Sequence, residues 1–177
     1  PREARLEEAG ADLIERMDDP RLEARGVVLT GASGAGKTQS LRRIFKKRFP
    51  TYDQRGSACP LVSIKVPSPC NMTALGRLAL KELGYPVVGE KKQHWLWEKV
   101  RERLQARGVK YLHLDEIQNI MAVANALESK ALRDTLKCFL NDIDNRVCLI
   151  LSGLPEVAEF LQQDAQERRR CAFLHFP

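Results

Sequence analysis

Apolar residues along this chain alternate between short continuous runs and longer stretches with helical spacing. A short apolar run bounded by turn residues is typical of a buried strand, whereas apolar residues three or four positions apart mark one face of a helix. The runs predict strands at residues 27–30, 61–66, 109–114, 147–151 and 172–176. The helical spacing predicts helices at residues 2–17, 37–49, 73–83, 92–107, 127–140 and 154–163. Alternating strands and helices indicate an α/β domain whose parallel sheet is covered by helices on both faces.

Two details inside these helices can be checked against a structure. Thr73 is the predicted N-cap of the helix at 73–83, because its hydroxyl can accept a hydrogen bond from a free backbone N–H. In the helix at 92–107 the predicted buried stripe consists of Trp95, Leu96, Val100 and Leu104. Trp95 is therefore expected to pack in the core, and an aromatic side chain that faces a partner is the alternative. The polar stretch at 50–60 is predicted to be a loop.

The segment between the first strand and the following helix matches the phosphate-binding pattern G-x-x-x-x-G-K-[ST] at every fixed position. Its residues are Gly31, Ala32, Ser33, Gly34, Ala35, Gly36, Lys37 and Thr38. The glycines let successive backbone N–H groups turn toward an anion, and the helix that starts near Lys37 adds the positive end of its dipole. Lys37 can reach the β- and γ-phosphates of a nucleotide, and the Thr38 hydroxyl can ligate Mg²⁺. An ordinary glycine-rich turn is the alternative, and the flanking strand and helix favour the nucleotide site.

The predicted strand at 109–114 is followed by two acidic residues, Asp115 and Glu116. The carboxyl end of a strand faces the crevice where open α/β sheets bind ligands. Asp115 is expected to hold Mg²⁺ beside Thr38, and Glu116 to orient or deprotonate a water that attacks the γ-phosphate. A surface acidic pair is the alternative interpretation, and the phosphate loop argues against it. Kinases of small substrates do not need the second carboxylate, so the pair favours a hydrolase.

Ser152 and a run of arginines are further candidates. Ser152 follows the strand at 147–151 and would lie between the carboxylates and the phosphate loop if the sheet order is 5-1-4-3-2. Its hydroxyl could then position the γ-phosphate and the attacking water, and a turn serine before Gly153 is the alternative. Arg168 or Arg169, presented to a neighbouring subunit, could act as an arginine finger that stabilises transition-state charge, with solvated charge as the alternative.

The composition fits one soluble domain and excludes several classes of protein. The chain has 177 residues, of which 44% are hydrophobic and 29% charged. No apolar run approaches the ~20 residues of a membrane-spanning helix, and the first residues lack the layout of a signal peptide. The five cysteines are widely spaced without a C-x-x-C pair, and the three histidines lie apart. A zinc site is therefore not expected, and reduced thiols in a cytoplasmic protein are.

The net charge of +6 permits nucleic-acid binding without requiring it. One group of basic residues lies on the helix after the phosphate loop, at Arg42, Arg43, Lys46, Lys47 and Arg48. A second group, a basic stripe of Lys130, Arg133 and Lys137, is predicted on the helix at 127–140. Either group could contact DNA, and a solvated helix face is the alternative.

Four segments together resemble AAA+ ATPases and, more narrowly, the TniB family of transposition proteins, which is related to TnsC, MuB and IstB. They are the phosphate-loop segment at 29–38, the proline-rich loop at 66–69 with the helix that ends in the Leu-Gly-Tyr-Pro segment at 83–86, the acidic segment at 112–119, and residues 151–156. The nucleotide motifs are typical of P-loop ATPases generally. The proline-rich loop and the Leu-Gly-Tyr-Pro segment are the features that indicate TniB.

This resemblance implies a P-loop NTPase (AAA+) core at residues 1–177, with an N-terminal helix at 1–17 and a five-stranded parallel sheet in the order 5-1-4-3-2. It implies ATP and Mg²⁺ as cofactors. By similarity, the Walker A residues are Lys37 and Thr38, the Walker B residues Asp115 and Glu116, the sensor-1 residue Ser152, and the finger Arg168 or Arg169. An AAA+ module normally continues into a helical lid, and nothing follows Pro177 here, so a truncated core with weak turnover is expected.

By the same resemblance, the expected function is that of an ATP-binding and ATP-hydrolysing regulator of DNA transposition. Such a protein would oligomerise as a ring or filament on double-stranded target DNA and communicate with a transposase, without membrane contact. The candidate DNA-facing parts are the loop at 67–71 and the basic stripe. Two alternatives stay open: a nucleotide-gated switch that recruits partners without binding DNA, and a small-molecule P-loop kinase.

Overall fold

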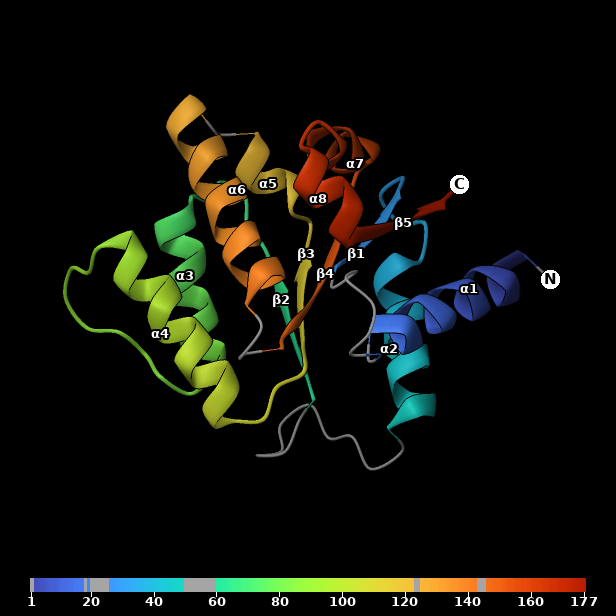
Figure 1. Ribbon diagram of the computed structural model, residues 1–177, viewed down its shortest axis with the longest axis horizontal. Coiled ribbons are helices and arrows are strands. Elements are labelled where there is room, and N and C mark those ends of the chain that lie inside the picture. The colour runs from blue at the N-terminus through green and yellow to red at the C-terminus, as the bar shows by residue number, and fades with distance from the viewer. Residues whose placement is uncertain (1, 18, 20–25, 50–59, 123–124, 143–145) are drawn as a thin grey trace.

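The computed structural model describes residues 2–17, 19, 26–49, 60–122, 125–142 and 146–177, which form a central sheet with helices on both sides (Figure 1). The predicted loop at 50–60 lies outside the described residues except for Pro60. Four of the cysteines, Cys70, Cys138, Cys148 and Cys171, are free thiols, and Cys59 lies outside the described residues.

The sheet has five parallel strands within the described residues. They are β1 (Gly26–Gly31), β2 (Leu61–Lys65), β3 (Tyr111–Asp115), β4 (Cys148–Gly153) and β5 (Cys171–Phe176). Their spatial order is β2-β3-β4-β1-β5, which confirms the order 5-1-4-3-2 expected from the sequence. Because the strands are parallel, the residues that follow β1, β3 and β4 meet at one edge of the sheet.

Helices cover both faces of the sheet (Figure 1). One face carries α1 (Arg2–Met17) and α2 (Lys37–Arg48). The other carries α3 (Met72–Glu82), α4 (Gln93–Ala106), α6 (Ala126–Asn141) and α7 (Pro155–Gln162). Two short helices, α5 (Gln118–Met121) and α8 (Ala165–Arg170), are not predicted by the apolar pattern. Segments this short contain too few turns to show a helical period.

Each face of the sheet has its own apolar core, because successive side chains of a strand point to opposite faces. Under α1 and α2, Phe45 packs edge-on against Tyr111 with ring centroids 4.9 Å apart. Under α3, α4, α6 and α7, the larger cluster contains Leu112, Leu114 and Leu151 from the central strands. Burial on both faces explains why the strands are continuous apolar runs rather than alternating ones.

Two details of the predicted helices are wrong. The N-cap of α3 is Asn71, not Thr73: the Asn71 side-chain oxygen accepts a hydrogen bond from the Ala74 N–H at 2.8 Å. On α4 the fully packed tryptophan is Trp97, which is 6% exposed and donates to the Met72 carbonyl at 3.0 Å, whereas Trp95 is half-buried at the edge of the same core. Trp97 lies three positions before Val100 on the same helix face, so the helical period places it inward.

Candidate nucleotide-binding site

The phosphate loop joins the end of β1 to the start of α2. Gly34 and Gly36 both have positive φ angles, 80° and 86°, a backbone conformation that other residues adopt at a cost. Gly36 is also the N-cap of α2, so the free N–H groups of the first helical turn open onto the loop. A Cβ atom at Gly34 or Gly36 would meet no atom within 4 Å, which shows open space beside the loop. The loop thus has the conformation of an anion cradle.

Lys37 is the cation of this cradle. Its side chain is only 5% exposed, and its Nζ donates hydrogen bonds to the carbonyl oxygens of Gly31 and Ala32, each at 2.8 Å. Among the described residues no carboxylate forms an ion pair with it. A buried ammonium without a neutralising acidic side chain fits an anionic phosphate, because a charge this buried needs a counter-charge.

Asp115 lies at the centre of the acidic half of the site. Thr38 Oγ1 donates to Asp115 Oδ2 at 2.7 Å, so the end of β3 directly contacts the start of α2. Ser152 Oγ donates to Oδ1 of the same carboxylate at 2.5 Å, as the β3–β4 register pairs these two residues. The structure therefore brings together three of the residues predicted from the sequence.

The hydrogen bonds at Asp115 keep its carboxyl ionised. Burial by itself raises the pKa of Asp115, but hydrogen bonds from Ser152 and Thr38 outweigh it and hold the pKa below its usual range. An ionised carboxylate beside a threonine hydroxyl is a donor set that suits Mg²⁺, which prefers oxygen ligands and keeps several waters. Thr38 and Asp115 are therefore the residues that would hold the metal.

Glu116 follows Asp115 at the same edge of the sheet. It has a φ of 60°, which makes it the one non-glycine residue with positive φ in the described part of the chain. Such a conformation costs about 1–3 kcal/mol and tends to occur at functional sites. Gln118 Nε2 donates to the Glu116 carboxylate, while Gln118 Oε1 accepts from the Leu154 N–H at 3.3 Å. Gln118 was not predicted from the sequence, because its contacts depend on how β3 and β4 end side by side.

His113 is a second residue of the site that was not predicted from the sequence. It lies on β3 two positions before Asp115 and is 1% exposed. Its Nδ1 lies 2.8 Å from Ser63 Oγ on β2, and its Nε2 lies 2.7 Å from Ser152 Oγ on β4. Burial lowers the pKa of His113 to about 4, since desolvation outweighs the nearby Asp115 carboxylate. A polar residue inside an otherwise apolar strand was the available signal.

Arg168 and Arg169 lie away from this chain's own phosphate loop. They are exposed on α8, which ends just before Cys171. Cys171 pairs with Gly26, at the opposite end of β1 from the loop. If either arginine acts as a finger, it must reach the site of a neighbouring subunit.

The basic stripe on α6 is largely occupied by contacts within the chain. Arg133 forms an ion pair with the buried Glu167 at 2.7 Å, and its guanidinium stacks 3.9 Å over the Phe160 ring. Lys137 forms an ion pair with Asp164, also at 2.7 Å. These contacts attach α6 to α7 and α8. Of the three stripe residues, Lys130 is exposed and forms no ion pair with the described part of the chain.

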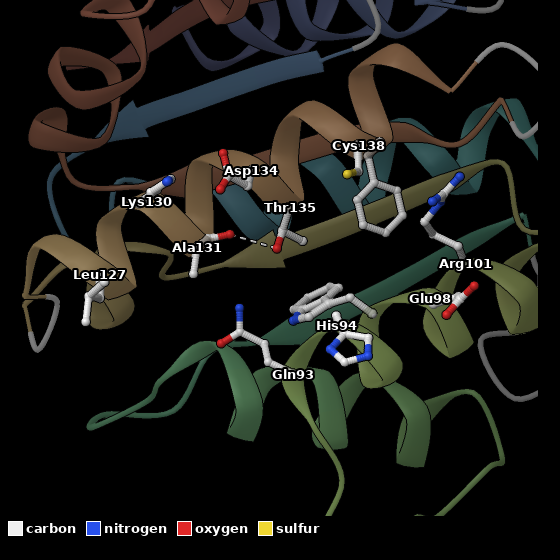
Figure 2. A pocket seen from close by; sticks show the side chains of 12 residues that line it. Gln93, His94, Glu98, Arg101, Leu127, Lys130, Ala131, Asp134, Thr135 and Cys138 are labelled. Carbon is white, nitrogen blue, oxygen red and sulfur yellow. Dashed lines mark hydrogen bonds between the residues drawn. The ribbon is translucent and has the colours of Figure 1, made fainter.

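A separate pocket of about 500 Å³ lies between α4 and α6 (Figure 2). Trp97 and Phe139 line its apolar part, and Arg101, Lys130 and Asp134 contribute charge. None of its lining residues belongs to the phosphate loop or to the Asp115 cluster. The pocket is therefore distinct from the nucleotide site.

Nearly the whole chain matches one known protein family. Residues 2–177 match the family model described as bacterial TniB protein. The chain belongs to the TniB family. This confirms the resemblance seen in the phosphate loop and the Leu-Gly-Tyr-Pro segment. No curated protein sequence matches the chain.

Solved structures similar to this TniB chain share its fold. ORC2 of Aeropyrum pernix, solved as ADPNP–ADP complexes, is 19% identical, with a TM-score of 0.71 over 97% of this chain and 46% of that one. Cdc6p of Pyrobaculum aerophilum is 21% identical, with a TM-score of 0.64 over 99% of this chain and 45% of that one. A chain from the structure of Drosophila ORC bound to AT-rich DNA and Cdc6 is 12% identical, with a TM-score of 0.59 over 97% of this chain and 55% of that one.

These similarities confirm the predicted fold class, an α/β core whose five-stranded parallel sheet is flanked by helices on both faces. The chain spans about half the length of each of these three structures. In the described part of this TniB chain, every helix is too short or too polar to cross a membrane.

Proposed function

We propose that this chain binds ATP with Mg²⁺ at the phosphate loop and hydrolyses it, and that hydrolysis regulates DNA transposition. In this proposal the protein oligomerises on double-stranded target DNA and communicates with a transposase. The observation that carries the ATPase part is the 2.7 Å hydrogen bond between Thr38 and Asp115. It lies beside Lys37, which is buried and forms no ion pair with a described carboxylate. Membership of the TniB family supports the transposition part.

Each residue of the site has a task in this proposal. Lys37 leaves its carbonyl partners to contact the β- and γ-phosphates, while the backbone N–H groups at Gly34 and Gly36 surround them. Thr38 and Asp115 would hold Mg²⁺, and a bound Mg²⁺ would supply positive charge that offsets the charge of the phosphate oxygens. Glu116 orients the attacking water and accepts its proton, and Ser152 holds the Asp115 carboxylate in place by donating a hydrogen bond to it.

Oligomerisation would complete the site. Arg168 and Arg169 are exposed and, among the described residues, make no side-chain hydrogen bond or ion pair. An arginine supplied by a neighbour would add a second positive charge to the one that Lys37 supplies. Mixing Glu116→Gln subunits with Arg168→Ala/Arg169→Ala subunits tests this arrangement. Restored turnover in the mixture supports a shared site, and turnover no greater than that of either variant alone contradicts it.

The DNA-facing surface is expected at the loop around Pro67–Pro69, which is exposed, together with Lys130. Similar structures support a DNA role, since one contains Drosophila ORC bound to AT-rich DNA. The test is binding of labelled duplex DNA with ATP, with ADP and without nucleotide, over a series of salt concentrations. Binding that requires ATP and weakens steeply with salt supports the proposal. An ATP-dependent complex that ignores DNA would instead indicate the partner-recruiting switch.

A further inference from the structure

A line of polar side chains crosses three neighbouring strands on the α2 side of the sheet. Ser63 lies at the edge strand β2, His113 on β3 and Ser152 on β4, and the line ends at Asp115. The contacts are 2.8 Å from Ser63 to His113, 2.7 Å from His113 to Ser152 and 2.5 Å from Ser152 to Asp115. His113 and Ser152 are 1% and 0% exposed, so water does not compete for these hydrogen bonds.

Hydrogen-bond donors along this line can be assigned from Asp115 outward. A carboxylate can only accept hydrogen bonds, so the Ser152 hydroxyl must donate its single hydrogen to Asp115. At the contact between His113 and Ser152, the histidine Nε2 must then be the donor. A neutral imidazole carries one N–H, so its Nδ1 accepts a hydrogen bond from the Ser63 hydroxyl.

The opposite tautomer does not fit the same distances. With the proton on Nδ1, Nε2 would be an acceptor and would need the Ser152 hydrogen. Ser152 and the Asp115 carboxylate would then face each other as two acceptors at 2.5 Å. Asp115 accepts at both of its oxygens, from Thr38 Oγ1 at Oδ2 over 2.7 Å and from the Glu116 N–H at Oδ1 over 3.1 Å, so this carboxylate takes the acceptor role. The Nε2–H form of His113 is the arrangement in which every contact has one donor and one acceptor.

We propose that His113 is a positioning residue of the ATPase site: its Nε2–H holds the Ser152 hydroxyl so that it donates to Asp115. This inference rests on the proposed ATP hydrolysis. Without the His113 donor, the Ser152 hydroxyl can rotate and Asp115 loses a fixed partner beside the position proposed for Mg²⁺. Loss of a hydrogen bond that orients a metal ligand typically lowers metal affinity or activity by about 10- to 100-fold. Fixed donors matter because they need no rearrangement when charge develops during the reaction.

A kinetic comparison separates positioning from mere packing. His113→Leu fills the buried position with an apolar side chain but removes the hydrogen-bond donor. His113→Gln can present an N–H at the same number of bonds from Cα as the histidine Nε2–H. The expected result is a fall in kcat of about 10- to 100-fold for His113→Leu. KM for ATP should stay within about threefold, and His113→Gln should recover most of the lost kcat. His94→Leu, on the exposed surface of α4, is the matched control and should keep wild-type turnover.

Unchanged kcat in His113→Leu, or equal losses in the Leu and Gln variants, would overturn the proposal. If His113→Leu does not fold, Ser63→Ala provides the second variant, because Ser63 is exposed at the sheet edge. Ser63→Ala removes the hydroxyl that donates a hydrogen bond to His113 Nδ1 and so favours the Nε2–H tautomer. It should lower kcat by about two- to fivefold, less than loss of the direct contact to Ser152. No change in its kcat would count against the proposal.

A spectroscopic test does not depend on ATP hydrolysis. The chain has three histidines, so ¹⁵N-labelled imidazole resonances can be assigned by single substitutions. Without nucleotide, His113 should show one tautomer, with Nε2 protonated and Nδ1 not, and Ser152→Ala should shift the Nε2 resonance. A protonated Nδ1 or rapid exchange between tautomers would overturn the proposal. If the wild-type protein releases no phosphate under any condition, the proposed function fails, and the tautomer alone decides the role of His113.

Discussion

The two faces of the sheet differ in what they bury. On the face under α3, α4 and α6, β3 and β4 contribute apolar side chains, among them Leu112, Leu114 and Leu151. On the face under α2, the same strands bury His113, Asp115 and Ser152 toward their carboxyl ends. Neighbouring residues of one strand therefore serve different purposes. Substitutions on the first face should mainly lower the free energy of unfolding. Substitutions on the second face should mainly lower ATPase activity and change the free energy of unfolding less.

The most direct way to test the apolar face is Leu112→Ala. Leu112 is fully buried. It lies between Tyr111 and His113 in the sequence, and its side chain points to the opposite face of the sheet from theirs. Removing its side chain should lower the free energy of unfolding by about 2–5 kcal/mol, as in other large-to-small core substitutions. Denaturant unfolding measures this loss. Nucleotide affinity per folded molecule should be unchanged, and a large fall in affinity at full folding would contradict the division between the faces.

The polar face should respond to acid in a way that the apolar face cannot. The pKa of His113 is lowered from 6.5 to about 4 by burial, so the folded state resists a proton that the unfolded state accepts. Stability is therefore complete above pH 6.5 and is lost as the pH falls from 6.5 toward 4, by an amount on the order of 3 kcal/mol.

Urea unfolding at several pH values across this window measures the loss. His113→Gln should flatten the dependence, because glutamine does not titrate. Parallel curves for the wild type and this variant would show that other groups cause the acid sensitivity.

A substitution in the phosphate loop should weaken nucleotide binding with little effect on the stability of the fold. Lys37→Met removes the ammonium but keeps most of the apolar stem, and should weaken ATP binding by about 10- to 100-fold, since hydrogen bonds to charged groups contribute about 1.5–3 kcal/mol. Calorimetric titration with ATP gives the affinity. The melting temperature without nucleotide should change by only a few degrees. Unaltered ATP affinity would remove Lys37 from the site.

The smallest effect is expected at the start of α3. Asn71→Ala removes the side-chain oxygen that caps Ala74 and should cost about 1 kcal/mol. Thr73→Ala is the matched control, because Thr73 lies inside the helix and should matter less. Thermal unfolding of both variants compares them. A larger loss for Thr73→Ala would restore the cap predicted from the sequence.

Most of this fold could be predicted from local patterns. Continuous apolar runs located all five strands, and the spacing of Leu41, Ile44 and Phe45 located α2. The phosphate loop and Asp115 were identified because their chemistry requires particular residue types in consecutive positions. Trp95 was predicted to be buried where Trp97 is, and the spacing of Trp97 to Val100 and Leu104 could have prevented this error.

The remaining features depend on which strands are neighbours. His113 contacts Ser63 and Ser152, which lie 50 and 39 positions away in the chain. Gln118 reaches Leu154 only because β3 and β4 end together. Residue patterns within one strand carry no information about such pairs until the sheet order is known. For the same reason, the ion pairs of Arg133 and Lys137 could not be foreseen, and both residues were assigned to a free basic stripe.

The measurement that tests the central claim most directly is phosphate release from ATP by the wild-type chain and by Glu116→Gln, with ATP affinity determined for both. The account predicts release by the wild type and a kcat about 10²- to 10⁴-fold lower in the variant, the usual range for loss of a general base. ATP affinity should stay within about threefold, since Lys37, Thr38 and Asp115 are intact. Equal turnover in both proteins, or no release by the wild type with Mg²⁺ and duplex DNA present, would contradict it.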